Sequence, residues 1–258
     1  MSSIPSLRLL LAGVALLAAC DNARSEQIDT PFEIVAQFPH DTGAYTQGLV
    51  WDDSVLYEST GRYGYSEVRR VDLRTGKALA TTRLAPDRFG EGLALLEGRL
   101  YQLTWESKVG YVYDAATLAR VDSFTYAGEG WGLATDGTSL VMSDGSDSLR
   151  FLSPTSFATE RVVKVRYQDS PLSKLNELEF VNGELLANVY ESDWVARIDP
   201  ASGTVRELID FAALWPRGQR PYGADVMNGI ARAPAPGELL LTGKLWPTVY
   251  SVRLKRAR

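Results

Sequence analysis

The tripeptide Gln47-Gly48-Leu49 sets a pattern that returns four more times along this chain of 258 residues. Each copy places a polar or aromatic residue before a small or acidic residue and an aliphatic one: Glu91-Gly92-Leu93, Trp131-Gly132-Leu133, Asn176-Glu177-Leu178 and Asn228-Gly229-Ile230. The first residues of successive copies are 44, 40, 45 and 52 positions apart. Repeats of this length with short strands are typical of β-propellers. Five copies therefore predict an all-β propeller with five four-stranded blades.

Outward from each tripeptide, short apolar runs alternate with turn signals. The second copy is the clearest, because it predicts four strands in order, at residues 92–96, 99–104, 110–113 and 120–125. Dipeptides that favour hairpin turns separate such runs, among them Glu97-Gly98, Asp136-Gly137 and Asn182-Gly183. The same order of strand and turn is expected in every blade.

The fifth repeat is one strand short, with predicted strands only at 229–232, 238–241 and 249–254. Residues 32–38 form an unassigned alternating run before the first repeat, and we expect them to supply the missing outer strand. Such an arrangement joins the two ends of the chain and closes the ring, which hides two sheet edges. Residues 210–225, which contain two prolines, predict an inserted loop or short helix beside the pocket.

The N-terminal segment has the features of an export signal. The segment 1–8 is short and carries positive charge, and residues 9–17 are apolar. The tetrapeptide Leu17-Ala18-Ala19-Cys20 that follows resembles the lipobox of bacterial lipoproteins. We therefore predict a signal peptide at 1–19, a lipid anchor on Cys20, a tether at 20–31 and the propeller domain at 32–258. An ordinary signal peptide with a chance cysteine is the alternative. Asp21 favours attachment to the inner membrane, on its periplasmic side.

The composition excludes several kinds of site. The net charge is −5 and we find no basic stripe, which argues against a nucleic-acid partner. His40 is the only histidine, so Ser-His-Asp catalysis and multi-histidine metal sites are excluded, and we expect His40 to be a loop residue. The segment Asp144-Gly145-Ser146-Asp147 lacks the spacing of a calcium loop and predicts a polar turn.

The first residues of the five tripeptides are expected to meet at one mouth of the central channel. Glu91 lies between two glycines, and burial there would raise the pKa of its carboxyl enough for proton transfer near neutral pH. From position alone, a carboxylate satisfied by backbone amides is an equal alternative. Gln47 and Asn176 are suited to orienting a peptide-like substrate, or else to holding strand ends together.

Two further groups of residues follow from the same geometry. Lys244 comes after the second strand of the fifth blade, where it either reaches over the mouth or is a solvated surface lysine. Five aromatic residues fall near the same strand ends and predict the walls of a small pocket: Tyr45, Phe89, Trp105, Trp131 and Tyr190.

The sequence resembles the plant-type glutaminyl cyclases, or glutaminyl-peptide cyclotransferases, in motifs that follow in order from about residue 32 to residue 254. The motifs are Tyr45-Thr46-Gln47-Gly48-Leu49, Glu58-Ser59-Thr60-Gly61-Arg62-Tyr63-Gly64, Phe89-Gly90-Glu91-Gly92-Leu93, Leu175-Asn176-Glu177-Leu178-Glu179, Val226-Met227-Asn228-Gly229-Ile230-Ala231 and Thr242-Gly243-Lys244-Leu245-Trp246-Pro247. Tyr45 stands where phenylalanine is common in that family, and Tyr190 where tryptophan is common.

The resemblance implies a five-bladed propeller that converts the N-terminal glutamine of peptides and proteins to pyroglutamate and releases ammonia. It implies no metal or other cofactor, and we expect a monomer. Glu91 would be the proton-shuttling carboxylate, and Gln47, Asn176 and Lys244 the polar pocket residues. The five aromatic residues would line the pocket.

Two other classes of function remain open. One is a propeller that binds peptides without catalysis. The other is a metal-dependent lactonase-type propeller, in which carboxylates and amides hold calcium on the axis. Such propellers usually have six blades and several axial acids, whereas only one axial acid, Glu91, is evident in this sequence.

Overall fold

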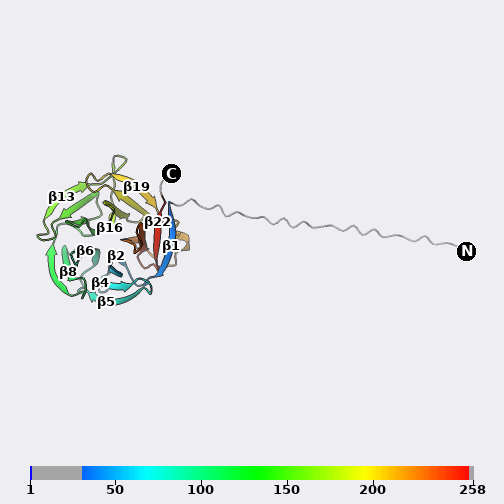
Figure 1. Cartoon of the computed structure of the whole chain (residues 1–258), viewed down its shortest axis with the longest axis horizontal. Helices are drawn as coiled ribbons and strands as arrows, with labels where there is room; N and C mark the ends of the chain where they lie inside the picture. The colour runs from blue at the N-terminus through cyan, green and yellow to red at the C-terminus, as the bar shows by residue number, and fades with distance from the viewer. Residues whose placement is uncertain (2–30, 256–258) are drawn as a thin grey trace.

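The computed structural model of the protein describes Met1 and residues 31–255, and from Phe32 onward the chain forms a ring of strands. Five four-stranded antiparallel sheets stand around one axis as the blades of a propeller (Figure 1). In blades one to four, the strands follow in chain order from the axis outward (Figure 1). The prediction of an all-β, five-bladed propeller with four-stranded blades is confirmed.

Blades one to four each use one continuous stretch of chain. Blade one contains β2 (Thr46–Asp52), β3 (Val55–Thr60), β4 (Glu67–Asp72) and β5 (Lys77–Arg83). Blade two contains β6 (Gly90–Leu96), β7 (Arg99–Thr104), β8 (Val109–Asp114) and β9 (Arg120–Thr125). Blade three contains β10 (Leu133–Thr135), β11 (Leu140–Ser143), β12 (Ser148–Leu152) and β13 (Thr159–Lys164). Blade four contains β16 (Leu175–Val181), β17 (Glu184–Val189), β18 (Trp194–Ile198) and β19 (Val205–Asp210).

Blade five joins the two ends of the chain. Its inner strands are β20 (Met227–Arg232), β21 (Glu238–Gly243) and β22 (Thr248–Leu254), and β1 (Phe32–Pro39) adds the outer strand. β1 and β22 lie side by side at the edge of the ring (Figure 1) and pair from Phe32–Leu254 to Pro39–Thr248. The predicted closure of the ring is therefore confirmed.

Apolar side chains fill each of the five interfaces between neighbouring blades. Alternate residues of a strand point to opposite faces of its sheet, so each blade contributes to the cluster on either side of it. For example, Val50 and Leu93 pack together between blades one and two, whereas Leu49 and Ala231 belong to the cluster between blades one and five. The ring is thus held by five separate apolar clusters rather than by a single core.

The repeated tripeptides lie where the inner strands lose their regular pairing. The register shifts between Thr46 and Gly48 in β2, between Gly90 and Leu93 in β6, and at the equivalent places in β16 and β20. Such irregularities release side chains from the ladder and redirect them. The glycine that follows allows close packing of blades, because a Cβ on Gly92 would lie 2.3 Å from the backbone nitrogen of Leu133.

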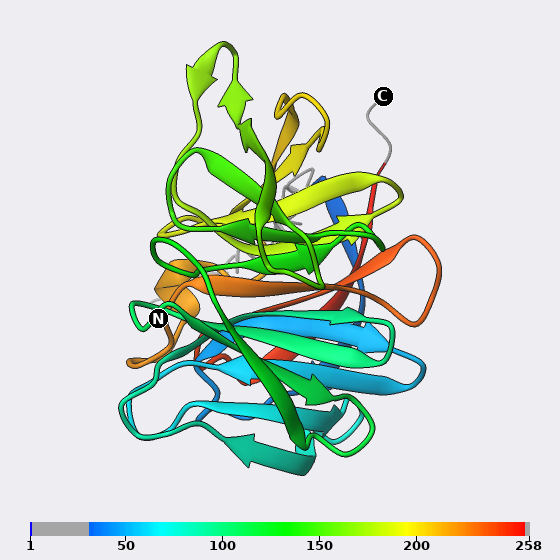
Figure 2. The ribbon, with the colours of Figure 1, turned by 90° about the vertical axis from the view of Figure 1, so that its left-hand side faces the viewer.

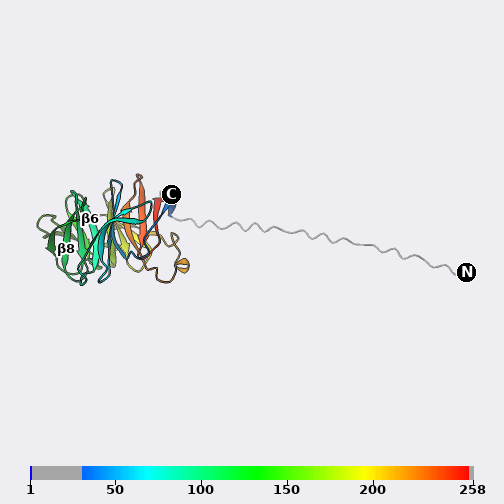
Figure 3. The ribbon, with the colours of Figure 1, turned by 90° about the horizontal axis from the view of Figure 1, so that it is seen from below.

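Two features lie outside the repeating pattern. A 3-10 turn, η1 (Arg217–Gln219), occupies the predicted insertion before blade five and lies at the edge of the ring (Figure 3). A short hairpin of β14 (Arg166–Tyr167) and β15 (Ser170–Pro171) projects from the connection between blades three and four (Figure 2) and was not predicted. Its Arg166 N–H donates to the Gly203 carbonyl of blade four at 2.9 Å. Neither feature interrupts a blade.

The predicted signal peptide at 1–19, the tether at 20–31, Cys20 and Asp21 lie outside the described residues, except for Met1 and Pro31. In the part of the chain that the structure describes, no helix has the length and apolar character needed to cross a membrane.

Candidate active site

A cavity of about 270 Å³ lies where the inner strands of the five blades begin. It is lined by the nine residues that the sequence analysis assigned to the site: Tyr45, Gln47, Phe89, Glu91, Trp105, Trp131, Asn176, Tyr190 and Lys244. They come from all five blades and are up to 199 positions apart, from 45 to 244. The propeller therefore brings these nine predicted residues together.

Glu91 lies in the irregular part of β6 and is 5 % exposed. Among residues 31–255, the single hydrogen bond to its carboxylate comes from Gln47, whose Nε2 lies 3.0 Å from Oε1. Burial raises the pKa of Glu91 well above its ordinary value; nearby Lys244 opposes this rise and Glu129 adds to it. No backbone amide within residues 31–255 donates to this carboxylate, and a raised pKa is what proton exchange closer to neutral pH requires of a carboxyl group.

Lys244 follows β21 and is buried rather than solvated, with 3 % exposure. Its Nζ lies 4.8 Å from the ring centroid of Tyr45 and 5.1 Å from that of Tyr190, so two aromatic faces stabilise the cation. Burial lowers the pKa of Lys244, while the charges of Glu91 and Asp225 work against this change. The site thus pairs a buried ammonium with a buried carboxylate.

The amide side chains have different partners. Asn228 donates to Gln47 Oε1 at 3.2 Å and to the Thr46 carbonyl at 3.0 Å, which fixes the amide that holds Glu91. Asn228 itself lies outside the cavity lining, although its tripeptide position predicted it at the mouth. Asn176 lines the cavity, and its Oδ1 is buried without a hydrogen-bond partner. An unpaired buried acceptor in a cavity wall is suited to a ligand N–H.

The aromatic walls are packed edge to face. The ring centroids of Phe89 and Trp105 are 5.7 Å apart, and those of Trp131 and Tyr190 are 5.5 Å apart. Glu129 accepts hydrogen bonds from both tryptophans. Sequence reasoning missed Glu129, although its position two residues before Trp131 places it next to a predicted wall.

Sequence reasoning also missed two acids on the inner strand of blade four. Glu177 is fully buried, and its carboxylate accepts from the backbone nitrogens of Leu49 at 3.2 Å and Ile230 at 2.8 Å. Burial raises the pKa of Glu177 well above its ordinary value, and burial raises that of Glu179 to about 7. The expectation of a single axial acid is therefore wrong. Glu177 occupies the tripeptide position that holds glycine elsewhere, and it ties blades one, four and five together.

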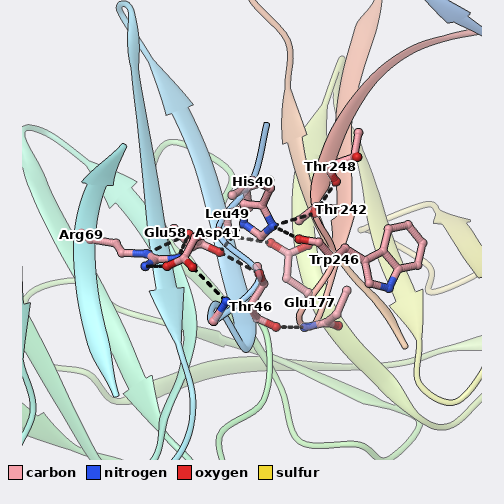
Figure 4. Close-up of polar contacts among 12 residues, drawn as sticks. His40, Asp41, Thr46, Leu49, Glu58, Arg69, Glu177, Thr242, Trp246 and Thr248 are labelled. Atoms are coloured by element: carbon pink, nitrogen blue, oxygen red, sulfur yellow. Dashed lines mark hydrogen bonds and ion pairs between the residues drawn. The ribbon is translucent and has the colours of Figure 1, made fainter. Parts of the chain in front are cut away.

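His40 lies after the closing strand, outside the cavity, and is part of a buried network (Figure 4). Its Nε2 lies 3.0 Å from Glu58 Oε1, and its Nδ1 lies 2.7 Å from the carbonyl oxygen of Trp246. Arg69 contacts the other oxygen of Glu58 through Nε at 2.9 Å and Nη2 at 2.8 Å. This network connects blade one to blade five. His40 lies in a loop, as predicted, but it is buried in this network.

The segment from Asp144 to Asp147 forms a polar turn, as predicted. Asp144 pairs with Arg150 at 2.7 Å, and Asp147 pairs with Lys164 at 2.7 Å. Within residues 31–255 no group of three or more histidine, cysteine or acidic side chains has a metal-binding arrangement.

Comparisons with known proteins agree on one family. A sequence model described as glutamine cyclotransferase matches residues 7–254. A glutaminyl-peptide cyclotransferase of Arabidopsis thaliana is 44 % identical over 231 residues, which cover 87 % of this chain and 72 % of that protein. The crystal structure of Myxococcus xanthus glutaminyl cyclase superposes with a TM-score of 0.83 at 39 % identity, over 88 % of this chain and 97 % of that one. A β-propeller domain of Cps50 (Swd1) from Myceliophteria thermophila shares the fold alone. It is 9 % identical and superposes with a TM-score of 0.52, over 87 % of this chain and 100 % of that one.

Proposed function

The chain belongs to the glutamine cyclotransferase family, and we propose that it converts N-terminal glutamine to pyroglutamate with Glu91 as the proton shuttle and without a metal. The observation that carries the proposal is one small cavity in which a buried, sparsely bonded carboxylate and a buried ammonium face aromatic walls. Peptides and proteins that begin with glutamine are the proposed substrates.

The cavity suits a glutamine side chain that folds back on its own α-amine. Its volume of about 270 Å³ holds a small group rather than a folded domain, so the rest of a peptide lies outside it. The aromatic walls exclude water and restrict the side chain to a bent conformation. Holding the two reacting groups of one residue together removes much of the entropic barrier to ring formation.

Proton transfer through Glu91 accounts for both halves of the reaction. The neutral α-amine attacks the side-chain carbonyl carbon, a new C–N bond forms, and the carbonyl oxygen takes up negative charge. The Glu91 carboxylate removes a proton from the attacking nitrogen and then returns it to the amide nitrogen. The bond to that nitrogen breaks, ammonia leaves, and Glu91 is again a carboxylate.

The other polar residues have separate tasks in this mechanism. Gln47 holds Glu91 in place, since its amide is itself fixed by Asn228. The Lys244 ammonium stabilises the oxyanion, where a charge in a water-poor site is most effective. The unpaired Oδ1 of Asn176 accepts an N–H group of the bound glutamine. None of these steps requires a cofactor.

Ammonia release from a peptide that begins with glutamine tests the proposal. Two matched peptides serve as controls: one begins with asparagine, whose shorter side chain would have to close a strained four-membered ring, and one has an acetylated amine. We expect ammonia and pyroglutamate only from the free glutamine peptide, unchanged in excess chelator. Binding without ammonia would indicate a peptide-binding propeller, and loss of activity in chelator would indicate metal dependence.

A second part of the proposal concerns location. We propose that the protein is exported, lipidated on Cys20 and held as a monomer on the periplasmic side of the inner membrane. Leu17-Ala18-Ala19-Cys20, the single cysteine and Asp21 support this assignment. Cys20→Ser should move the protein from the membrane fraction to the soluble fraction, and a wild-type protein that is already soluble would refute lipidation.

A further inference from the structure

The two tryptophan walls of the cavity share one hydrogen-bond acceptor. Glu129 Oε2 lies 2.7 Å from Trp105 Nε1 and 2.9 Å from Trp131 Nε1. The tryptophans belong to different blades, since Trp105 follows β7 and Trp131 precedes β10. We propose that Glu129 is a positioning residue for the cyclisation, which clamps both indoles as fixed walls and places a negative charge near Glu91. This inference rests on the proposed function.

The backbone around Glu129 is held in place. Gly128 adopts φ +83°, a conformation that side chains rarely allow. The Gly130 N–H donates to the Trp105 carbonyl at 3.0 Å, and a Cβ on Gly130 would lie 2.5 Å from the Tyr126 hydroxyl. The backbone beside Glu129 is therefore bonded to Trp105, the same residue whose indole the Glu129 side chain holds.

The clamp decides which part of each indole faces the substrate. Glu129 is not among the residues that line the cavity, so both indole N–H groups are bonded away from it. Without this acceptor, each ring would be free to turn and seek another partner for its N–H, including water in the cavity. A wall that moves no longer enforces the bent glutamine conformation, because orientation depends on fixed contacts.

The charge of Glu129 acts on the proton shuttle as well. The charged groups that face Glu91 are Lys244 from blade five and Glu129 from the loop between blades two and three. Tyr45, Tyr126 and Tyr190 also lie near Glu91. Burial is the main cause of the raised pKa of each phenol; Asp225 adds more than Glu91 does for Tyr45 and Tyr190, and Glu91 makes a small contribution to all three. Removing the Glu129 charge should lower the pKa of Glu91. Burial would still raise this pKa, but the one remaining nearby charge, on Lys244, lowers it.

Glu129→Gln tests the clamp, with Glu106→Gln as the matched control. Glu106 is an exposed acid beside Trp105 and has no hydrogen bond or ion pair within residues 31–255. Glu129→Gln keeps an oxygen that can accept from the indoles but removes its charge. We expect it to raise KM for a glutamine peptide roughly three- to tenfold, as when charge-assisted hydrogen bonds become neutral ones. It should also move the acidic limb of kcat/KM to lower pH. Glu106→Gln should change neither quantity.

Indole N–H signals in a ¹H–¹⁵N spectrum give a readout that does not depend on activity. The chain has six tryptophans, and Trp105→Phe and Trp131→Phe identify the two signals of interest. Glu129→Gln should shift both signals and leave the others in place. Unchanged indole signals, or an unchanged KM and acidic limb in an active protein, would overturn the role of Glu129. A wild-type protein that releases no ammonia would overturn the proposed function instead, and the indole signals would still decide whether the clamp exists.

Discussion

Glu58 and Glu91 are both buried carboxylates on neighbouring blades, yet their surroundings are opposite. Glu58 accepts hydrogen bonds from His40, Thr46 and Arg69 (Figure 4). Burial alone would raise the pKa of Glu58, but the charges of Arg69 and His40 outweigh it and hold the pKa well below the ordinary range. Glu91 has a single amide donor, and burial raises its pKa.

The difference explains how one fold can hold both a structural carboxylate and the carboxylate that we propose as the proton shuttle. A carboxylate surrounded by donors and cations is stabilised in its charged form and resists protonation. A carboxylate that is buried with few partners destabilises the folded state when it is charged, and it exchanges protons readily for the same reason. Glu58 therefore stabilises the joint between blades one and five, and Glu91 is kept available at the cost of some stability.

The largest expected effect on stability concerns Glu58. Glu58→Gln leaves the buried His40 without its acidic partner and leaves Arg69 with only the partly exposed Asp41, at 2.8 Å, so the free energy of unfolding should fall by about 3–5 kcal/mol at pH 7. Because the folded-state pKa of Glu58 is lowered, the loss should be complete above the unfolded pKa and should shrink as pH falls below about 4. Denaturant titration at about pH 3 and at about pH 7 measures both values.

Glu67→Gln is the matched control for Glu58→Gln. Glu67 lies in the adjacent strand β4 and pairs at 3.0 Å with Arg83, whose side chain is 80 % exposed. A surface pair of this kind is worth about 0–1 kcal/mol. Equal losses in the two variants would contradict the structural role assigned to Glu58.

The next effect concerns Asn176, which lines the same cavity as Glu91. Asn176→Ala removes the unpaired acceptor from the cavity wall, so kcat should fall about 10²-fold, in the range seen when one transition-state hydrogen bond is lost. The melting temperature should change little, because Oδ1 has no partner in the folded protein. A rise in KM with unchanged kcat would instead mean that Asn176 only binds the substrate.

A smaller effect is expected on the pH dependence of catalysis. Glu91 must be a carboxylate to accept the first proton, so kcat/KM should rise as pH rises through its pKa. This limb is separate from that of the substrate α-amine, whose ordinary pKa is about 7.7–8.0. Because the pKa of Glu91 is raised, the midpoint of its limb should lie above the ordinary glutamate value of about 4.3. A midpoint at or below about 4.3 would show that the base is a carboxylate stabilised in its charged form, as Glu58 is, and would contradict the role of Glu91.

Much of the fold and the site could be predicted, because both depend on a repeated local signal. The tripeptides identify the blades, and equivalent positions of a propeller meet at one mouth, so Gln47, Glu91 and Asn176 could be brought together without coordinates. Residues 32–38 could be assigned to blade five because that repeat was visibly one strand short.

The residues that were missed depend on contacts between blades that no local pattern records. Glu129 resembles a solvated loop charge until its two indole partners, one of them 24 positions away, are placed beside it. Glu177 replaces a glycine of the tripeptide, and its partners Leu49 and Ile230 are more than 50 positions away. Their roles become apparent only when the ring is closed.

The most direct test of this account is Glu91→Gln, measured in parallel for turnover and stability. Turnover should fall roughly 10²–10⁴-fold, as for the loss of general acid–base catalysis. The folded-state pKa of Glu91 is raised, so its favourable contribution exists below the unfolded pKa and disappears as pH rises. The variant should therefore equal or exceed the wild type in stability at pH 8, by on the order of 1 kcal/mol, with the difference shrinking toward pH 4. A variant that is less stable at pH 8 and loses activity only in proportion to unfolded protein would contradict the account, because Glu91 would then be a structural carboxylate like Glu58.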